Sequence, residues 1–198
     1  QEAFDIEGLI RYSRESLIAA DADPDLVWSD WDVLFVVHAG ADWQNDVFQD
    51  SPIDLPTFSI TFSDSELVIS DEGDTLSSMI TYPESASQDT YQVALNGGIA
   101  HEMGHQLGLL DLYNVETFAP TVGFYDLMDS GNLASVFVPS PANEDSRVEV
   151  VGVLPSAVGA WNRWLVTFSL GLEPEVVKGD RPRARLRAIQ ARPPLPPN

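Results

Sequence analysis

The 198-residue sequence contains no cysteine and a single lysine. The lack of cysteine excludes both disulfides and thiolate metal sites. No apolar run is long enough to cross a membrane and no signal peptide opens the chain, so we expect no membrane insertion. The chain begins at Gln1 rather than at methionine, which favours a product trimmed from a precursor.

Positive charge is scarce outside the last 21 residues. Residues 178–198 carry six bases and one acid, whereas residues 1–177 carry four bases and thirty acids. An acidic body repels nucleic acid and anionic membrane surfaces, so we expect no nucleic-acid partner. The acidity fits a salty or calcium-containing exterior, and it equally fits the solubility of a secreted protein.

The length suits one domain with a substantial core. We predict one main domain over residues 1–177, with an upper lobe of about residues 1–108 and a lower lobe of about residues 109–177. Residues 178–198, rich in arginine and proline, are predicted to be a tail or linker. The sequence contains no internal repeat and does not indicate an oligomeric state.

Residues 100–111, A-H-E-M-G-H-Q-L-G-L-L-D, contain two of the three histidines. On a helix His101 and His105 lie one turn apart on one face, where two imidazoles can bind one metal ion. Glu102 lies about 100° further round, beside the metal, where it can take a proton from a bound water. This is the H-E-x-x-H signature of a zinc peptidase helix. Four apolar residues define a stripe predicted to face away from the histidines: Leu95, Ile99, Met103 and Leu107.

The residues after this helix supply a candidate third metal ligand. Gly108 can adopt a left-handed conformation that ends the helix and turns the chain back. Asp111 would then reach the metal, and a carboxylate oxygen is an ordinary zinc ligand. Two alternatives stay open: Asp111 as a helix cap or salt-bridge partner, and Glu116 as the third ligand.

Hydrophobic spacing predicts a mixture of helices and strands, hence an α+β domain. The residue range 33–38 is an apolar run typical of a buried strand. After residue 111 the chain is predicted to be irregular, up to a helix near its end. We predict helices at 4–20, 91–107 and 155–165, and strands at 33–38, 57–62, 66–70, 76–82 and 166–170.

The loop over residues 41–56 is rich in aspartate. Asp42, Asp46 and Asp50 are candidate ligands for calcium, which prefers carboxylate oxygens. The loop lacks the D-x-D-x-D-G series of an EF-hand, so the calcium site is a secondary prediction.

Two stretches carry a family resemblance: H-E-M-G-H-Q-L-G-L-L-D-L-Y and F-Y-D-L-M-D-S-G. They resemble the immune inhibitor A family of secreted bacterial metallopeptidases. Shorter matches are V-V-H-A-G, T-Y-P-E and G-A-W-N-R-W-L, so the resemblance touches most of residues 25–170. It implies a zincin-like, metzincin-related catalytic domain: a mixed sheet with an N-terminal helix, an active-site helix and a C-terminal helix. It also implies secretion of a precursor whose pro-segment is removed.

The resemblance assigns roles to five residues. It implies that His101 and His105 bind zinc and that Glu102 is the general base. Asp111 occupies the place of the third ligand, where the broader metzincin group has a histidine. Met128 would be the methionine of a turn beneath the metal, although a lone methionine is more often core packing.

Three further residues have open roles, and two others depart from the family pattern. His38 ends a predicted strand, either as a cleft residue beside the site or as an ordinary histidine at a strand end. Tyr113 and Tyr125 are candidate oxyanion stabilisers. Two residues depart from the family pattern: Leu110 stands where a proline is usual, and Asn114 where an aspartate is common.

These features predict a zinc-dependent endopeptidase acting on a protein or peptide substrate. An extended substrate could pair with the edge of the strand over residues 76–82. The alternative is an acidic, calcium-dependent extracellular binding or adhesion domain with a structural or vestigial zinc site. An inactive truncated fragment is a third hypothesis.

Overall fold

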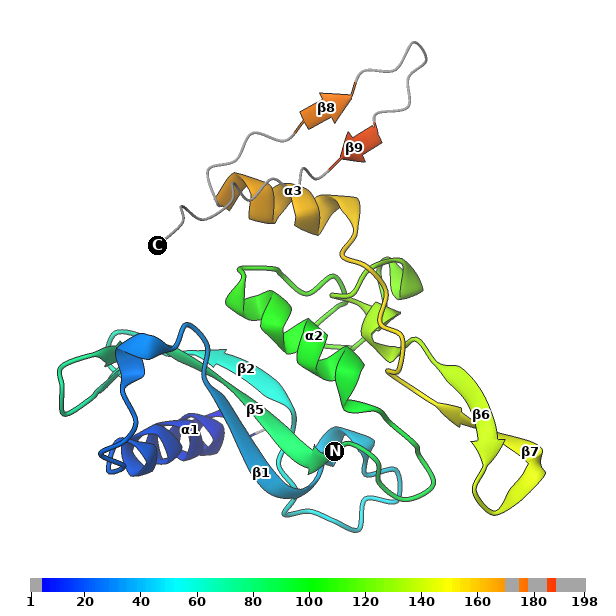
Figure 1. The fold of residues 1–198 in the computed structure, drawn as a ribbon, viewed down its shortest axis with the longest axis horizontal. Helices are drawn as coiled ribbons and strands as arrows, with labels where there is room; N and C mark the ends of the chain where they lie inside the picture. Colours follow the sequence, from blue (N-terminus) through cyan, green and yellow to red (C-terminus); the bar gives the residue numbers. More distant parts are fainter. Residues whose placement is uncertain (1–4, 170–174, 178–184, 188–198) are drawn as a thin grey trace, which may run out of the picture.

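The computed structural model describes residues 5–169, 175–177 and 185–187. Within these residues the chain is an α+β fold with three α-helices, one three-stranded sheet and three two-stranded sheets (Figure 1). The predicted α+β class is therefore confirmed. The helices are α1 (Ile6–Ala20), α2 (Leu95–Gln106) and α3 (Ala160–Ser169).

The main sheet is mixed and lies between α1 and α2 (Figure 1). Its strand order is β1 (Phe35–Ala41), β5 (Ser78–Ser85), β2 (Phe58–Thr61). β1 runs parallel to β5, and β2 runs antiparallel to it. The predicted edge strand over residues 76–82 is wrong, because β5 is the central strand and has a neighbour on each side.

Helix α1 confirms the first predicted helix. Asp5 caps its start, accepting a hydrogen bond from the backbone N–H of Gly8 at 2.9 Å. Leu17 is buried against Met79 of β5. The core between α1 and the sheet consists of buried Leu17, Trp28, Phe62, Val68, Leu76 and Met79.

Strand β1 begins two residues later than predicted and is not buried on both faces. Phe35 and Val37 point to one face, and Val37 is 65% exposed. The expectation of a buried strand is wrong because the face of β1 that carries Phe35 and Val37 is left exposed. Two further predicted strands are confirmed at their centres, as β2 and as β3 (Val68–Ile69), which pairs with β4 (Thr75–Leu76).

The chain after α2 contains a hairpin that the sequence analysis missed. β6 (Val136–Ser140) and β7 (Asn143–Val150) pair antiparallel and project from the body (Figure 1). The predicted strand at 166–170 is also wrong for its described part, because α3 continues to Ser169. β8 (Glu175–Val177) pairs with β9 (Arg185–Arg187), so part of the predicted tail is a strand.

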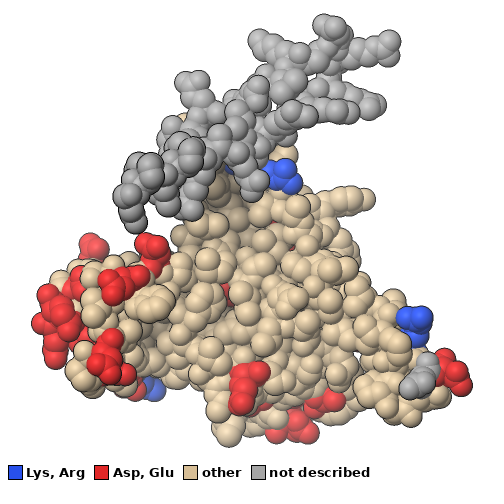
Figure 2. Space-filling view, viewed as in Figure 1, with Lys and Arg blue, Asp and Glu red and all other residues tan. Residues whose placement is uncertain are grey.

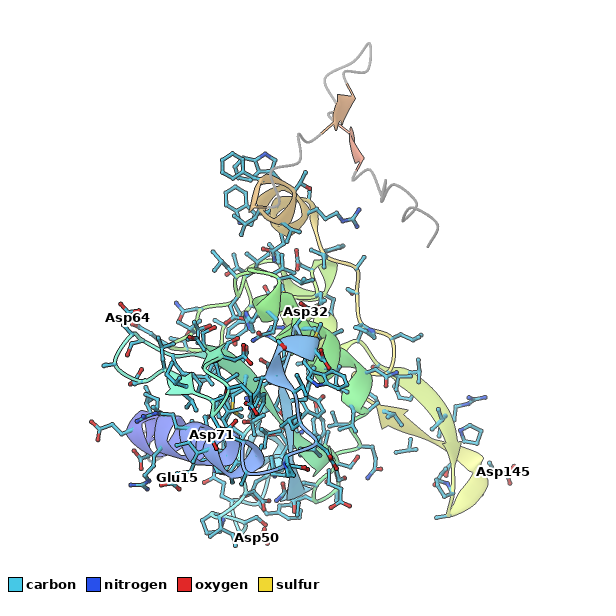
Figure 3. All side chains as sticks on the ribbon, turned by 60° about the vertical axis from the view of Figure 1, so that its left-hand side comes forward. Glu15, Asp32, Asp50, Asp64, Asp71 and Asp145 are labelled. Carbon is cyan, nitrogen blue, oxygen red and sulfur yellow. The ribbon has the colours of Figure 1, made fainter. Side chains whose placement is uncertain are left out.

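Acidic side chains gather on the part of the molecule built from α1 and the main sheet (Figure 2). Glu15, Asp64 and Asp71 point outward there, and Asp145 lies on the β6–β7 hairpin (Figure 3). The middle of the face drawn in Figure 2 is largely free of charged residues. Among the described helices, none is both long and apolar enough to cross a membrane.

Candidate metal centre

Helix α2 carries both histidines of the H-E-x-x-H motif, but it begins at Leu95 rather than at residue 91. Residues before it are extended, and the backbone N–H of Ala94 donates to Val151 at 2.8 Å. The predicted apolar stripe is not the buried face, since Ile99 and Leu107 are exposed. The buried side of α2 consists instead of Gly97, His101, Glu102 and Gly104.

Glycines let α2 approach its neighbours closely. A Cβ at Gly97 would collide with the backbone carbonyl of Asn132, and one at Gly98 with the hydroxyl of Tyr82. That Tyr82 hydroxyl donates to the carbonyl of Leu95 at 2.6 Å and so attaches the start of α2 to β5. The prediction of an apolar buried face is wrong here because the glycines let the backbone of α2 pack directly against its neighbours, without apolar side chains between them.

The helix ends at Gln106, and Gly108, two residues later, adopts the predicted left-handed conformation with φ +83°. The backbone N–H of Leu109 then returns to the carbonyl of Gly104 at 2.9 Å. Leu109 is buried, and two residues later Asp111 reaches the open side of both histidines. The left-handed turn therefore sets the position of the carboxylate.

Three side-chain atoms converge at this point. His101 Nε2 lies 3.1 Å from Asp111 Oδ1, and His105 Nε2 lies 3.3 Å from the same oxygen. The two imidazole rings are nearly perpendicular, with centroids 4.9 Å apart. Four-coordinate zinc with ligands at 2.0–2.1 Å places its ligand atoms about 3.3 Å apart. The observed spacing matches that geometry.

Hydrogen bonds to backbone carbonyls fix the tautomer of both histidines. His101 Nδ1 lies 3.1 Å from the carbonyl of Leu127, and His105 Nδ1 lies 3.0 Å from the carbonyl of Leu109. Because a carbonyl only accepts, each Nδ1 carries the proton and each neutral ring directs the lone pair of Nε2 inward. Asp111 Oδ1 is buried and has no hydrogen-bond partner among the described residues. Three acceptors facing one another require a cation or a proton between them.

The pKa shifts of His105 and Asp111 reflect the same proximity. Burial lowers the pKa of His105, but the neighbouring Asp111 carboxylate outweighs burial, so the pKa is raised overall. Burial raises the pKa of Asp111, but His101 and His105 outweigh it and hold that pKa well below its usual range. With a proton between them, the imidazoles and Asp111 form the predicted salt bridge, and a divalent cation can bind the same three atoms.

Glu102 is the second acid at this centre and stands apart from the converging atoms. Its residue is buried, and burial raises the pKa of its carboxyl, while His101 and His105 partly counter the effect. Its carboxylate accepts no hydrogen bond from another described residue. A buried, raised-pKa carboxyl next to a metal centre has the properties of a general base.

Met128 lies beneath the helix, fully buried, in a core with Leu109 and Leu127. A Cβ at Gly104, between the two histidines in sequence, would come within 2.5 Å of the sulfur of Met128. The floor role and the core-packing role predicted for Met128 are therefore compatible. The neighbouring carbonyl of Leu127 is the one that orients His101.

Two buried aspartates that the sequence analysis did not single out hold this turn. Asp126 accepts from the N–H of Met128 at 2.8 Å and from that of Gly159 at 2.7 Å. Asp129 Oδ2 accepts three backbone N–H groups, at 2.7 to 2.9 Å, from Thr121, Val122 and Gly123. Their presence on either side of Met128 was the available signal. Both carboxylates accept hydrogen bonds from backbone N–H groups that would bond to backbone carbonyls in a helix or a sheet.

Of the two predicted oxyanion tyrosines, Tyr113 lies at the centre and Tyr125 does not contact it. The Tyr113 ring stacks on His101 with centroids 6.3 Å apart. Burial, with Asp111 and Glu102 nearby, raises the pKa of Tyr113 above its ordinary value. Tyr125 is 89% exposed, and none of its described contacts reaches the metal centre.

The departures from the family pattern leave Asp111 in place. Leu110 is exposed, and its carbonyl accepts from the buried side chain of Asn162 at 3.4 Å. Asn114 Oδ1 accepts the N–H groups of Glu116 and Thr117, both at 2.9 Å. An aspartate would accept the same two bonds. Glu116 is exposed and does not join the converging group of described residues.

His38 lies on the far face of the sheet. His38 pairs with Pro83 of β5, and paired residues point to the same face of a sheet. Tyr82, the residue before Pro83 in β5, points to α2, and side chains alternate along a strand, so Pro83 and His38 point to the other face. The Nδ1 of His38 lies 3.1 Å from the carbonyl of Ala39. This placement does not support the cleft role for His38. The alternative of a satisfied histidine at a strand end is not borne out either, because β1 continues to Ala41 and the buried Nε2 of His38 has no hydrogen-bond partner among the described residues.

The predicted calcium ligands are only partly brought together. Asp42 is buried and accepts hydrogen bonds from the backbone and hydroxyl of Thr57, so its place in the calcium set is wrong. Asp46 and Asp50 lie close to Asp89. Asp46 and Asp89 also accept backbone N–H groups of the loop. Loop closure accounts for these carboxylates without an ion.

Comparison with protein-family models and with curated proteins finds no match for this chain.

Proposed function

We propose that this chain is a zinc-dependent endopeptidase with a zincin-like fold, similar to the immune inhibitor A family and secreted from a precursor. One observation carries the proposal: two Nε2 lone pairs and the orphaned Oδ1 of Asp111 converge at zinc-ligand spacing, beside a buried Glu102 that has no partner among the described residues. Nitrogen and carboxylate oxygen are donors that zinc accepts.

His101, His105 and Asp111 would hold the ion. A zinc ion with three protein ligands supplies a Lewis acid and lowers the pKa of water in its open position. Glu102 takes the proton of the attacking water on its carboxylate and returns it to the nitrogen of the leaving amine.

Strand β2 replaces β5 as the proposed partner of an extended substrate. β2 is an edge strand of the sheet within the described residues. The hydroxyl of Ser59 in β2 accepts from the side chain of Gln106 at 2.8 Å, and Gln106 follows His105 directly. A peptide paired to this edge would therefore pass the end of α2 that carries the metal ligands.

Two substitutions test the proposal. Glu102→Gln should retain one zinc ion per chain and lower kcat/KM on a casein or peptide substrate by roughly a thousandfold or more. His105→Ala should lose the zinc as well as the activity. Zinc content is measured by atomic absorption, and cleavage with and without a chelator. Full activity of Glu102→Gln would show that Glu102 is not the base.

The second candidate function is the calcium-dependent binding domain, favoured by the proximity of Asp46, Asp50 and Asp89. A structural zinc site is usually closed by four protein ligands, whereas three converge here. Calcium titration by calorimetry separates the two functions. Tight calcium binding, combined with zinc but no cleavage, would favour the binding domain.

A further inference from the structure

Three aromatic rings form a row from the metal centre to the surface. The rings of His101 and Tyr113 have centroids 6.3 Å apart, and those of Tyr113 and Phe118 are 6.1 Å apart. Each pair is close to parallel, at 26° and 25°. His101 is buried, Tyr113 is half-buried and Phe118 is 66% exposed. The row therefore makes a continuous apolar wall that starts at a candidate metal ligand.

The backbone holds Phe118 in an unusual conformation. Its φ is +56°, in the left-handed region that aromatic residues rarely adopt. Its N–H donates to the carbonyl of Asn114 at 2.7 Å, and the N–H of Asn114 donates to Ala119 at 2.9 Å. Tyr113 also bridges Pro120. This closed turn keeps the exposed ring against Tyr113, so no large rearrangement is needed before a ligand binds.

The residues before and after Tyr113 and Phe118 in the chain also expose large apolar side chains. The exposed members are Leu107, Leu110, Val115, Val122 and Phe124.

We propose that Tyr113 and Phe118 form the side wall of a substrate pocket next to the metal, which selects peptides with an aromatic or large aliphatic side chain close to the cleaved bond. The inference rests on the proposed zinc endopeptidase function and adds its substrate class. An apolar wall beside the reacting groups discriminates by the apolar area that the substrate buries there.

The test uses the full zinc-loaded chain and peptides that differ at one position flanking the cleaved bond. Each of the four nearest positions carries Phe, Leu, Ala or Arg in turn. At one of them, kcat/KM should favour Phe over Ala by about tenfold or more. Phe118→Ala should reduce this ratio to about twofold, and Phe118→Leu should give an intermediate ratio.

Phe137→Ala is the matched control. Phe137 is 62% exposed, nearly as much as Phe118, but lies on the projecting β6 strand. The control should keep the wild-type Phe-to-Ala ratio. A second readout is the affinity of uncleaved peptides for Glu102→Gln, measured by calorimetry. The Phe peptide should bind about tenfold more tightly than the Ala peptide, and adding Phe118→Ala should remove the difference.

Two failures are distinguishable. If the wild type cleaves peptides but Phe118→Ala keeps its ratio, or if Arg is preferred to Phe at every position, the pocket is wrong and the peptidase function stands. If the zinc-loaded wild type cleaves no peptide, the endopeptidase function fails and the pocket fails with it.

Discussion

The two parts of the molecule on either side of α2 are stabilised in different ways. Before α2, regular strands and α1 enclose an apolar core around Leu17 and Met79. After α2, irregular loops surround a smaller apolar core containing Met128, and buried aspartates bind the backbone. The regular part places α2, whereas the irregular part supplies Asp111 and the turn beneath the two histidines. The geometry of the candidate site thus depends on the part with the smaller apolar core.

The difference has a physical cause. Buried backbone N–H groups need acceptors, and helices and sheets provide them without side chains. The loop over residues 121–123 has no such ladder, so its three N–H groups converge on one oxygen of Asp129. Stability in this part is concentrated in a few charged groups, including the metal ligands.

Removing zinc should have the largest effect. At a free zinc concentration a thousandfold above Kd, binding stabilises the folded protein by roughly 4 kcal/mol. We expect a chelator to reduce amide exchange protection after α2, for example at Leu112, whose N–H donates to Met128 at 2.8 Å. Protection at Ile80, whose N–H donates to Leu34 at 2.9 Å, should change much less. Equal losses at both amides would show that the two parts unfold as one unit.

Leu17→Ala should come next, with a loss of about 3 kcal/mol in the free energy of unfolding. Leu17 is almost fully buried, and its removal leaves a cavity between α1 and the sheet. Because Leu17 is remote from α2, zinc affinity and kcat/KM at 25 °C should stay within about twofold of wild type. Urea unfolding and zinc titration measure the two quantities. A large loss of zinc affinity would mean that the apolar core and the metal centre are coupled.

Asp129→Asn should lower the free energy of unfolding by about 2 kcal/mol, which is less than the effect of Leu17→Ala. It should, however, reduce function more than Leu17→Ala does. The amide keeps an oxygen acceptor but loses the charge that strengthens three backbone hydrogen bonds. The Met128 turn should loosen, so zinc affinity should fall, in contrast to Leu17→Ala. Unchanged zinc affinity would separate the loop over residues 121–123 from the metal centre.

Sequence patterns predicted the regular part better than the irregular one. The apolar spacing of α1 and the H-E-x-x-H motif were sufficient because both depend on helix periodicity. The prediction of the buried face of α2 was wrong, because Gly97 and Gly104 have no side chain and so let other residues approach the helix closely. The central position of β5 could not be predicted, because strand order is set by contacts between distant segments.

The irregular part escaped prediction for a related reason. Asp126 and Asp129 were not distinguished from surface acids, because their position beside Met128 is a weak signal in a sequence with 31 acidic residues. The convergence of Asp111 with the histidines agrees with the predicted set. Its role as a ligand rested mainly on resemblance and stays a prediction, while the distances to both Nε2 atoms show that the carboxylate lies where the sequence placed it.

The pH dependence of stability should be the smallest effect and should distinguish the two parts again. Burial raises the pKa of Asp129, but the N–H groups of residues 121–123 outweigh it, so the pKa is lowered from 3.8. A carboxyl with a lowered folded-state pKa stabilises the protein above its unfolded-state pKa, and that contribution is lost as the pH falls from about 4 through the folded-state pKa. Urea unfolding of the zinc-free protein between pH 3 and 6 measures it.

Asp129→Asn should lose less stability toward pH 3 than wild type, and Leu17→Ala should lose as much as wild type. Asp111, whose pKa is also lowered, titrates in all three proteins, so the difference between them reports Asp129 alone. Parallel curves for wild type and Asp129→Asn would mean that the charge on Asp129 does not stabilise the loop.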